Sequence, residues 1–310
     1  MRFLPKFRRG AAVSIAVAGL ATVSACSPFS NNSTAATING ASVSRDTVES
    51  YIAEFAANQQ LPMTNGVIAT DDARGVIAGV IKAKAYNQYL DSVGKPLTSA
   101  QRATVLKQIA DQGVGNLSKN LQGLIVDINA ATAAITELKT PSDETIERLY
   151  KKNPSLTGAM CVRHIVVKKK ETAAKMLGLL SNGANFAALA KKYSIEPAAK
   201  KTGGALGGQT SDGKPSPCMS ILEYQSGFDP AFTAGVLAAK AGVPYGPVQS
   251  SFGWHVILVE KWDTVKDAVL DLVKAQPGAN LATGWLANSR ITVDPAYGHW
   301  SAATGSLVAN

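Results

Sequence analysis

The residue types in this chain that could do chemistry are its cysteines and histidines. Cys161 and His164 share one β-branched run, CVRHIVV, and His255 lies in another, WHVILV. Both runs are typical of β-strands. Neither Cys161 nor Cys218 stands in a setting typical of a nucleophile, so the sequence disfavours thiol catalysis. The two strand histidines remain as candidates.

Length and composition indicate what kind of elements must position these residues. A chain of 310 residues is long enough for about two domains. Hydrophobic residues make up 46% and charged residues 17%, so a packed core can form and disorder throughout is excluded. Aromatic residues are only 6% and alanine is abundant, which favours helices of small residues over an aromatic-rich β-sandwich.

Nearly half of the net charge of +9 comes from the start of the chain. Arg2, Lys6, Arg8 and Arg9 carry four of these charges, and taking the four from +9 leaves +5. That balance is ordinary for the remaining length, and no basic stripe interleaved with aromatic residues is present. The sequence therefore argues against nucleic acid as a partner.

The N-terminus reads as a targeting segment. Residues 1–9 are basic, residues 11–23 are apolar, and small residues follow. The apolar run is too short to span about 30 Å of hydrocarbon comfortably. This order predicts a signal peptide over residues 1–25, with a membrane-anchoring helix as the alternative. No later apolar segment is long enough to span a membrane.

The end of this segment, Val23-Ser24-Ala25-Cys26, resembles the lipobox of bacterial lipoproteins. The resemblance implies that Cys26 is lipidated and anchors the protein to a membrane outside the cytoplasm, in the cell envelope. Residues 26–36 are small and polar, as a flexible tether should be. Cys161 and Cys218 then remain, and an oxidising compartment favours a disulfide between them, worth on the order of 4 kcal/mol. Two buried free thiols are the alternative.

After the expected tether, the sequence changes once from a helical pattern to a mixed pattern of strands and helices. Residues 37–153 open with a short strand and turn and continue as a helical module, in which Ser44 and Thr98 are expected N-caps. Residues 158–262 combine strand-like runs with short helices split by Gly and Pro, as in one compact α+β domain. The tail, residues 263–310, carries one helical pattern and one short strand-like run.

The second of these parts resembles the parvulin family of peptidyl-prolyl isomerases over residues 160–261. The resemblance rests on several blocks in the family's order. They are RHIVV at 163–167, NFAALA…YS at 185–194, GGALG at 203–207, Phe232 at an apolar pocket position, GPV at 246–248 and FGWHVI at 252–257. The number and order of the blocks make the resemblance specific.

The flanking parts are similar to those of PrsA- and SurA-type envelope foldases. In those proteins the N- and C-terminal parts pack together into a chaperone module around the parvulin insert. The resemblance therefore implies an α+β protein with a helical N-terminal module that the C-terminal segment completes. Residues 291–293 and Trp300 would fold back on residues 37–152.

Family membership also implies an activity, the rotation of X-Pro peptide bonds. The barrier is about 20 kcal/mol, and no bond is broken, so the chemistry calls for no strong nucleophile, metal or cofactor. It is enough to bind the twisted amide better than the planar one. The resemblance assigns the catalytic positions to His164, Glu196 and His255. It assigns the walls for the proline ring to Leu206, Phe228, Phe232 and Phe252, of which Phe252 beside a glycine turn is the preferred pocket residue.

Two positions depart from the family pattern, and each assignment has a simpler alternative. Glu196 stands where the family usually has Asp or Cys, and Ala205 replaces the acid of GGDLG. The histidines could equally be a hydrogen-bonded core pair that holds adjacent strands in register. The aromatic residues would serve a core as well as a pocket, and Gly203, Gly204 and Gly207 are expected only to form a tight turn.

These observations leave three functional hypotheses. The first is a lipid-anchored prolyl isomerase and foldase, whose partners are unfolded exported polypeptides with X-Pro bonds and, through the anchor, a membrane. The second is a holdase chaperone that retains the parvulin fold without catalysis, which the departures at Glu196 and Ala205 favour. A solute-binding lipoprotein is the third, and the sequence disfavours it because two α/β lobes joined by a hinge are not evident.

Overall fold

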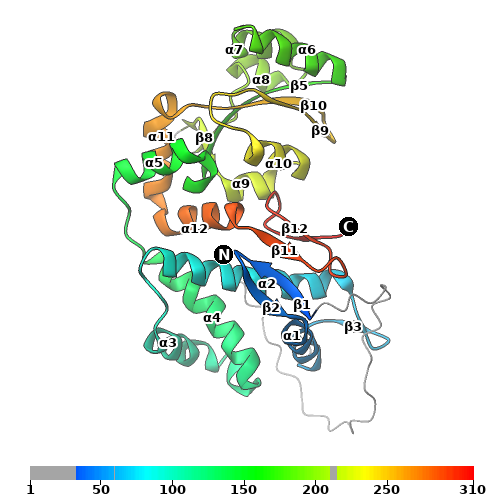
Figure 1. Cartoon of the computed structure of the whole chain (residues 1–310), viewed down its shortest axis with the longest axis vertical. Helices are drawn as coiled ribbons and strands as arrows, with labels where there is room; N and C mark the ends of the chain where they lie inside the picture. Colours follow the sequence, from blue (N-terminus) through cyan, green and yellow to red (C-terminus); the bar gives the residue numbers. More distant parts are fainter. Residues whose placement is uncertain (1–32, 59, 210–214) are drawn as a thin grey trace. The chain divides into compact units, whose positions relative to one another are not determined.

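The computed structural model describes residues 33–58, 60–209 and 215–310 (Figure 1). The expected signal peptide and Cys26 lie outside these residues. The described chain forms two compact units. The first unit comprises the described residues up to Ala134, with Arg290–Trp300 and Ser306–Asn310, and the second comprises Ile135–Ser289 with Ser301–Gly305. Helices and strands occur in both units, and the predicted α+β class is confirmed.

A three-stranded sheet in the order β11-β1-β2 joins the two ends of the chain in the first unit. Strand β1 (Thr34–Ile38) pairs with β2 (Ala41–Ser44) on one edge and with β11 (Ile291–Val293) on the other, both antiparallel. The C-terminal segment thus completes the N-terminal module, as predicted. The expected tether extends too far, however, because residues 34–36 already belong to β1.

Two helices of the first unit, α1 and α3, begin at the caps that the sequence predicted. Ser44 Oγ accepts the Thr47 N–H at 3.1 Å at the start of α1, and Thr98 and Gln101 form a capping box at the start of α3. Arg45 pairs with the buried carboxylate of Asp294, which fixes α1 to the tail. The elements are α1 (Arg45–Ala57), β3 (Met63–Thr64), β4 (Val67–Ile68), α2 (Thr70–Ser92), α3 (Ser99–Ala110), η1 (Val114–Asn116), α4 (Lys119–Thr136), β12 (His299–Ser301) and β13 (Ser306–Val308).

A four-stranded sheet in the order β8-β5-β10-β9 forms the centre of the second unit. Its strands are β5 (Ala159–Val167), β8 (Cys218–Ser220), β9 (Tyr245–Ser250) and β10 (Gly253–Val259), and all neighbours are antiparallel. Strand β5 is buried along almost its whole length, which explains its unbroken run of apolar and β-branched residues.

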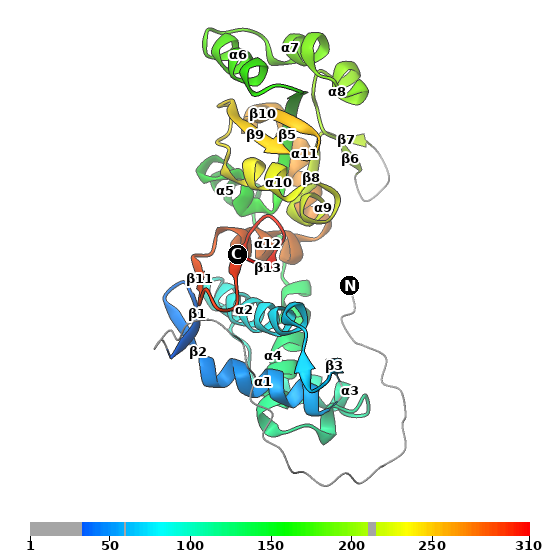
Figure 2. The same cartoon turned by 90° about the vertical axis from the view of Figure 1, so that its right-hand side faces the viewer.

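Helices cover both faces of this sheet (Figures 1 and 2). On one face, α6 (Lys170–Ser181) and α7 (Phe186–Tyr193) pack against Ile165 and Val256. On the other, α9 (Ile221–Gly227) and α10 (Pro230–Ala238) pack against Val162 and Ile257. The remaining short elements between β5 and β8 are α8 (Pro197–Thr202), β6 (Gly208–Gln209) and β7 (Pro215–Ser216).

Three elements that the sequence assigned wholly or mainly to the flanking parts belong to the second unit. They are α5 (Asp143–Lys152), α11 (Trp262–Ala275) and α12 (Pro277–Asn288), and η2 (Pro154–Thr157), which the sequence assigned to neither part, belongs to this unit as well. The fully buried Tyr150 packs against Trp262 with ring centroids 5.6 Å apart, and its hydroxyl donates to the Glu260 carbonyl at 2.9 Å. Of the tail expected at 263–310, only Arg290–Trp300 and Ser306–Asn310 join the first unit.

A disulfide joins Cys161 and Cys218, which face each other across β5 and β8 with Cα atoms 4.0 Å apart. Both residues are fully buried. The bond closes a loop of 57 residues that includes α6, α7 and α8. Among the described residues, none of the helices is both long and apolar enough to cross a bilayer.

Reducing this disulfide should destabilise the second unit. Because a closed loop limits the conformations of the unfolded chain, we expect a loss of about 2–4 kcal/mol in the free energy of unfolding. Urea denaturation with and without a phosphine reductant measures it. The Cys161→Ser/Cys218→Ser variant serves as the control and should not respond to the reductant. Titration of Cys161 and Cys218 as free thiols in denatured, unreduced protein would contradict the bond.

Candidate functional site

A cavity of about 400 Å³ opens on the face of the sheet that carries α9 and α10. All seven residues that the sequence assigned to catalysis and substrate binding line this cavity, namely His164, Glu196, Leu206, Phe228, Phe232, Phe252 and His255. Asp229 and Ser250, which the sequence analysis did not single out, line it as well. The cavity is therefore the place where the chemistry of the second unit must be sought.

The register of two strands brings the histidines together. His164 lies opposite Ile257, and His255 lies opposite Val166, in the antiparallel pairing of β5 and β10. The two histidines are thus diagonal neighbours on one face of the sheet. Their Nδ1 atoms lie 3.3 Å apart, and the rings are inclined by only 13°. Both side chains are buried, at 6% and 4% exposure.

Glu196 is held beside His164 by backbone contacts to the same strand. Ser194 Oγ accepts the Val166 N–H at 3.3 Å, and the Ile195 N–H donates to the Val166 carbonyl at 2.9 Å. These contacts place Glu196 at the N-cap of α8, with its Oε2 2.7 Å from His164 Nε2. The residue that departs from the family pattern therefore still reaches the histidine pair.

The hydrogen-bond roles along this chain of side chains follow from the carboxylate. Glu196 Oε2 and His164 Nε2 are in close polar contact, although this contact lacks hydrogen-bond geometry. Because an ionised Glu196 can only accept, the contact favours the proton on His164 Nε2, which leaves Nδ1 of the neutral ring to accept. His255 Nδ1 is then the donor to His164, and His255 Nε2 accepts from Ser250 Oγ at 2.7 Å. Ser250 Oγ in turn accepts the Phe252 N–H at 3.0 Å. One direction of donation runs from the β9–β10 turn to Glu196.

Burial keeps both imidazoles neutral near pH 7. Desolvation, with a smaller contribution from the neighbouring His164, lowers the pKa of His255 to about 4, while Asp229 opposes the shift. Desolvation also lowers the pKa of His164, although Glu196 favours its charged form. Burial alone would raise the pKa of Asp229, but hydrogen bonds from Ser251 and the α10 backbone outweigh it and lower that pKa.

The apolar wall of the cavity consists of aromatic side chains. Phe232 is 2% exposed and contacts both imidazoles, with centroid distances of 5.4 Å to His164 and 4.9 Å to His255. Phe228 packs on Phe232 at 5.7 Å. Phe252 stands at the rim, where it lines the cavity while 73% of it is exposed. The deep wall is thus Phe232, and Phe252 forms part of the exposed rim of the cavity.

Two residues that the sequence analysis missed support this arrangement. Ser250 lies five residues before His255 in the β9–β10 hairpin. Pairing the two strands around the turn at Phe252 and Gly253 would have indicated from the sequence that Ser250 lies near His255. Asp229 caps α10 and accepts from the Ser251 N–H and hydroxyl at 3.0 and 2.8 Å. The Asp-Pro start of that helix is a typical N-terminal signal, but its contact with Ser251 is not visible in sequence.

Taken together, these features describe a buried polar centre set against an apolar wall. The neutral histidines lie between an apolar wall and one carboxylate, and no group of three or more His, Cys, Asp or Glu side chains within the described ranges could hold a metal ion. Such a site can grip an apolar group and exclude water from a polar one.

Acidification should destabilise the second unit through His255. Because its pKa is lowered from 6.5 to about 4, the folded chain binds fewer protons than the unfolded chain between these values. Stability is therefore complete above about pH 6.5 and is lost as the pH falls towards 4, by up to about 3 kcal/mol from this group. Urea denaturation at several pH values measures it. The His255→Gln variant should lack the part of the pH-dependent loss of stability that comes from this histidine. An unchanged pH dependence in that variant would show that His255 is not its source.

Comparisons with known proteins agree with this description. Residues 146–262 match the family model described as the PPIC-type PPIase domain. The foldase protein PrsA of Clostridium kluyveri is 34% identical over 153 residues, which cover 48% of this chain and 41% of the relative. PrsA of Clostridium botulinum is 30% identical over 146 residues, 43% of this chain and 40% of the relative.

The matched part therefore spans about two fifths of these curated relatives. The crystal structure of PrsA from Bacillus subtilis is also similar, with 19% identity, a TM-score of 0.29 and coverage of 79% of this chain and 87% of that one. The part of the chain that carries the histidine pair and its aromatic wall, residues 146–262, thus matches the PPIC-type PPIase domain.

Proposed function

We propose that this chain is a peptidyl-prolyl cis–trans isomerase that assists the folding of exported proteins. The observation that carries the proposal is the convergence of His164, His255 and Glu196 on one cavity with an aromatic wall. The departure at Glu196 favoured a chaperone without catalysis. It is a weaker argument for that hypothesis now, because the longer side chain still contacts His164. A holdase with the same fold remains the second candidate.

The physical task is to favour the twisted amide over the planar one. The planar X-Pro amide is stabilised by charge separation between its nitrogen and oxygen, and this stabilisation is lost at the top of a barrier of about 20 kcal/mol. An environment poor in water and charge supports the planar form less than water does. The buried Phe232 against two imidazoles supplies such an environment.

The neutrality of the histidines matters for the same reason. A protonated imidazole beside the carbonyl oxygen would stabilise the charge-separated planar amide, and so would slow rotation. Because desolvation lowers the pKa of both His164 and His255, the rings act as neutral hydrogen-bonding groups at the pH of most environments. Their fixed direction of donation leaves no free choice of tautomer while Glu196 is ionised.

We further propose that the protein works outside the cytoplasm, held by lipid on Cys26. The motif Val23-Ser24-Ala25-Cys26 after a basic and apolar segment supports the anchor. The Cys161–Cys218 bond supports an oxidising compartment, because disulfides are rare in reducing ones. The partners would be unfolded exported polypeptides that contain X-Pro bonds.

Shortening Phe252 should reduce turnover without reducing stability. Because its side chain is 73% exposed, Phe252→Ala removes a cover for bound substrate but little of the core. We expect kcat/KM for a short X-Pro peptide to fall roughly tenfold, which corresponds to about 1.4 kcal/mol of transition-state binding. Protease-coupled cis-to-trans turnover by the full-length chain measures it.

The matched control is Val243→Ala, which shortens another exposed apolar residue of the second unit outside the cavity. Its turnover should equal that of the wild-type chain. Absence of turnover in a folded wild-type protein would instead favour the holdase.

Substitutions of Glu196 should separate its hydrogen bond from its charge. Glu196→Gln keeps an acceptor for the His164 Nε2–H and is expected to retain most of the turnover. Glu196→Ala removes the acceptor, and a loss of roughly tenfold is expected because the histidine tautomers are no longer fixed. The same peptide assay measures both variants, and equal activity in Glu196→Ala and wild type would remove Glu196 from the site.

A further inference from the structure

We propose that Arg163 is a positioning residue of the isomerase site, which acts by holding the segment from Glu196 to Leu206 against β5. This inference rests on the proposed function, because it concerns the same cavity. Arg163 directly precedes His164 on β5, so the two side chains leave opposite faces of the strand. Arg163 therefore does not line the cavity, and any effect on turnover must pass through its partners.

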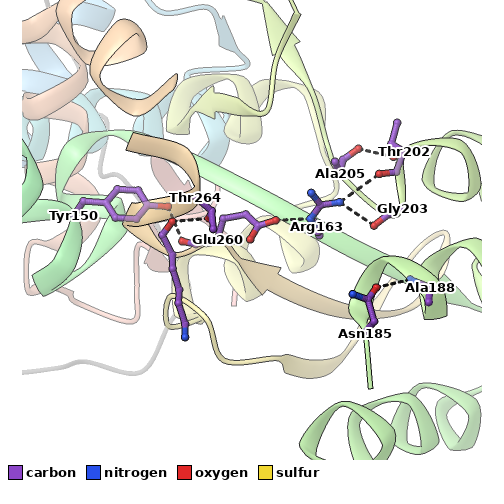
Figure 3. Close-up of polar contacts among 10 residues, drawn as sticks. Tyr150, Arg163, Asn185, Ala188, Thr202, Gly203, Ala205, Glu260 and Thr264 are labelled. Carbon is purple, nitrogen blue, oxygen red and sulfur yellow. Dashed lines mark hydrogen bonds and ion pairs between the residues drawn. The ribbon is translucent and has the colours of Figure 1, made fainter. Parts of the chain in front are cut away.

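The guanidinium of Arg163 connects two segments that are far apart in sequence (Figure 3). Its Nε pairs with the carboxylate of Glu260, just after β10. Its Nη1 donates to the carbonyls of Thr202 and Gly203 at 3.3 and 3.2 Å. These carbonyls stand at the C-terminal end of α8, where helices leave acceptors unsatisfied and where a cation is favourable.

The segment that Arg163 holds carries two lining residues of the cavity, one at each end. Glu196 caps the start of α8, and Leu206 follows the turn at its end. Between them, Gly204 has φ +85°, and a Cβ on it would lie 2.4 Å from the His164 carbonyl oxygen. Its own carbonyl accepts the His164 N–H at 2.8 Å. The turn thus approaches β5 too closely for a side chain.

Glu260 is itself fixed, so the ion pair is more than a surface contact. Its N–H donates to the Cys161 carbonyl at 2.9 Å, and its carbonyl accepts from the Tyr150 hydroxyl at 2.9 Å. The side chains of Arg163 and Glu260 are only 31% and 19% exposed. Figure 3 shows the resulting line of contacts from Tyr150 through Glu260 and Arg163 to Thr202 and Gly203.

Loss of this line should disturb the histidines before it unfolds the unit. Without Arg163, α8 loses its only side-chain cation at the Thr202 and Gly203 carbonyls among the described contacts. The Glu196 carboxylate would then lie less firmly against His164, and the direction of donation along the histidine pair would no longer be unique. We expect a mixture of tautomers and a lower kcat, with little change in KM, because the apolar wall is unchanged.

The test uses the full-length chain labelled with ¹⁵N-histidine, which contains only three histidines, so that His299 serves as an internal reference. Long-range ¹H–¹⁵N spectra report the tautomers of His164 and His255 in wild type, Arg163→Gln and Arg163→Lys. In wild type we expect a proton on His164 Nε2 and on His255 Nδ1. In Arg163→Gln we expect mixed tautomers and a kcat reduced roughly tenfold.

Arg163→Lys covers the case in which Arg163→Gln fails to fold. Lysine retains the charge opposite Glu260 but cannot contact the carboxylate and both carbonyls in one fork, so an intermediate loss is expected. The matched control is Lys274→Gln, which breaks the Lys274–Asp143 ion pair of the same unit. It should cost similar or less stability and leave tautomers and kcat unchanged.

The outcomes separate this inference from the proposed function. Wild-type tautomers and kcat in folded Arg163→Gln or Arg163→Lys would overturn the positioning role. A loss of kcat that Lys274→Gln shows to the same extent for the same fall in melting temperature would also overturn it and assign Arg163 to stability alone. If the wild-type chain shows no turnover, the proposed activity fails, whereas the tautomer measurement still decides whether Arg163 positions Glu196.

Discussion

The antiparallel register of β5 and β10 is the constraint on which the site depends. It places His164 opposite Ile257 and His255 opposite Val166, so both imidazoles reach the same face of the sheet. The period of a strand is two, and a slip of one residue would send one histidine into the cluster beneath α6 and α7. The apolar neighbours on each face fix the register, because a slip would also exchange buried Ile165 and Val256 for polar atoms.

The edge of β5 that faces away from β10 explains how the long segment between β5 and β8 can build a wall of the cavity. Strand β8 pairs with its first residues, the Gly204–Leu206 turn bonds to its middle, and Ser194 with Ile195 bonds to Val166 near its end. Each piece satisfies backbone groups that would otherwise be buried without partners. The segments that bring Glu196 and Leu206 to the cavity are therefore fixed by the same backbone bonds that complete the sheet.

Much of the site could be predicted from sequence because its residues lie in ordered motifs. The strand runs around His164 and His255, the wall residue Phe232 and the acid Glu196 all have fixed positions within the family pattern. Contacts that depend on the meeting of distant segments could not be found in this way. Helices α5 and α11 belong to the second unit, where Tyr150 of α5 packs against Trp262 of α11. No local sequence pattern distinguishes that contact from packing within a helical module.

The sheet of the first unit gives the chain a definite order of assembly. Thr37 of β1 and Thr292 of β11 are neighbours although 255 positions separate them. A chain made or exported from its N-terminus thus completes nearly all of the second unit before the partner of β1 exists. Until then one edge of β1 stays unpaired, an open template for other strands. In this protein the module that emerges first is the last to close, after the sheet of the second unit has been made.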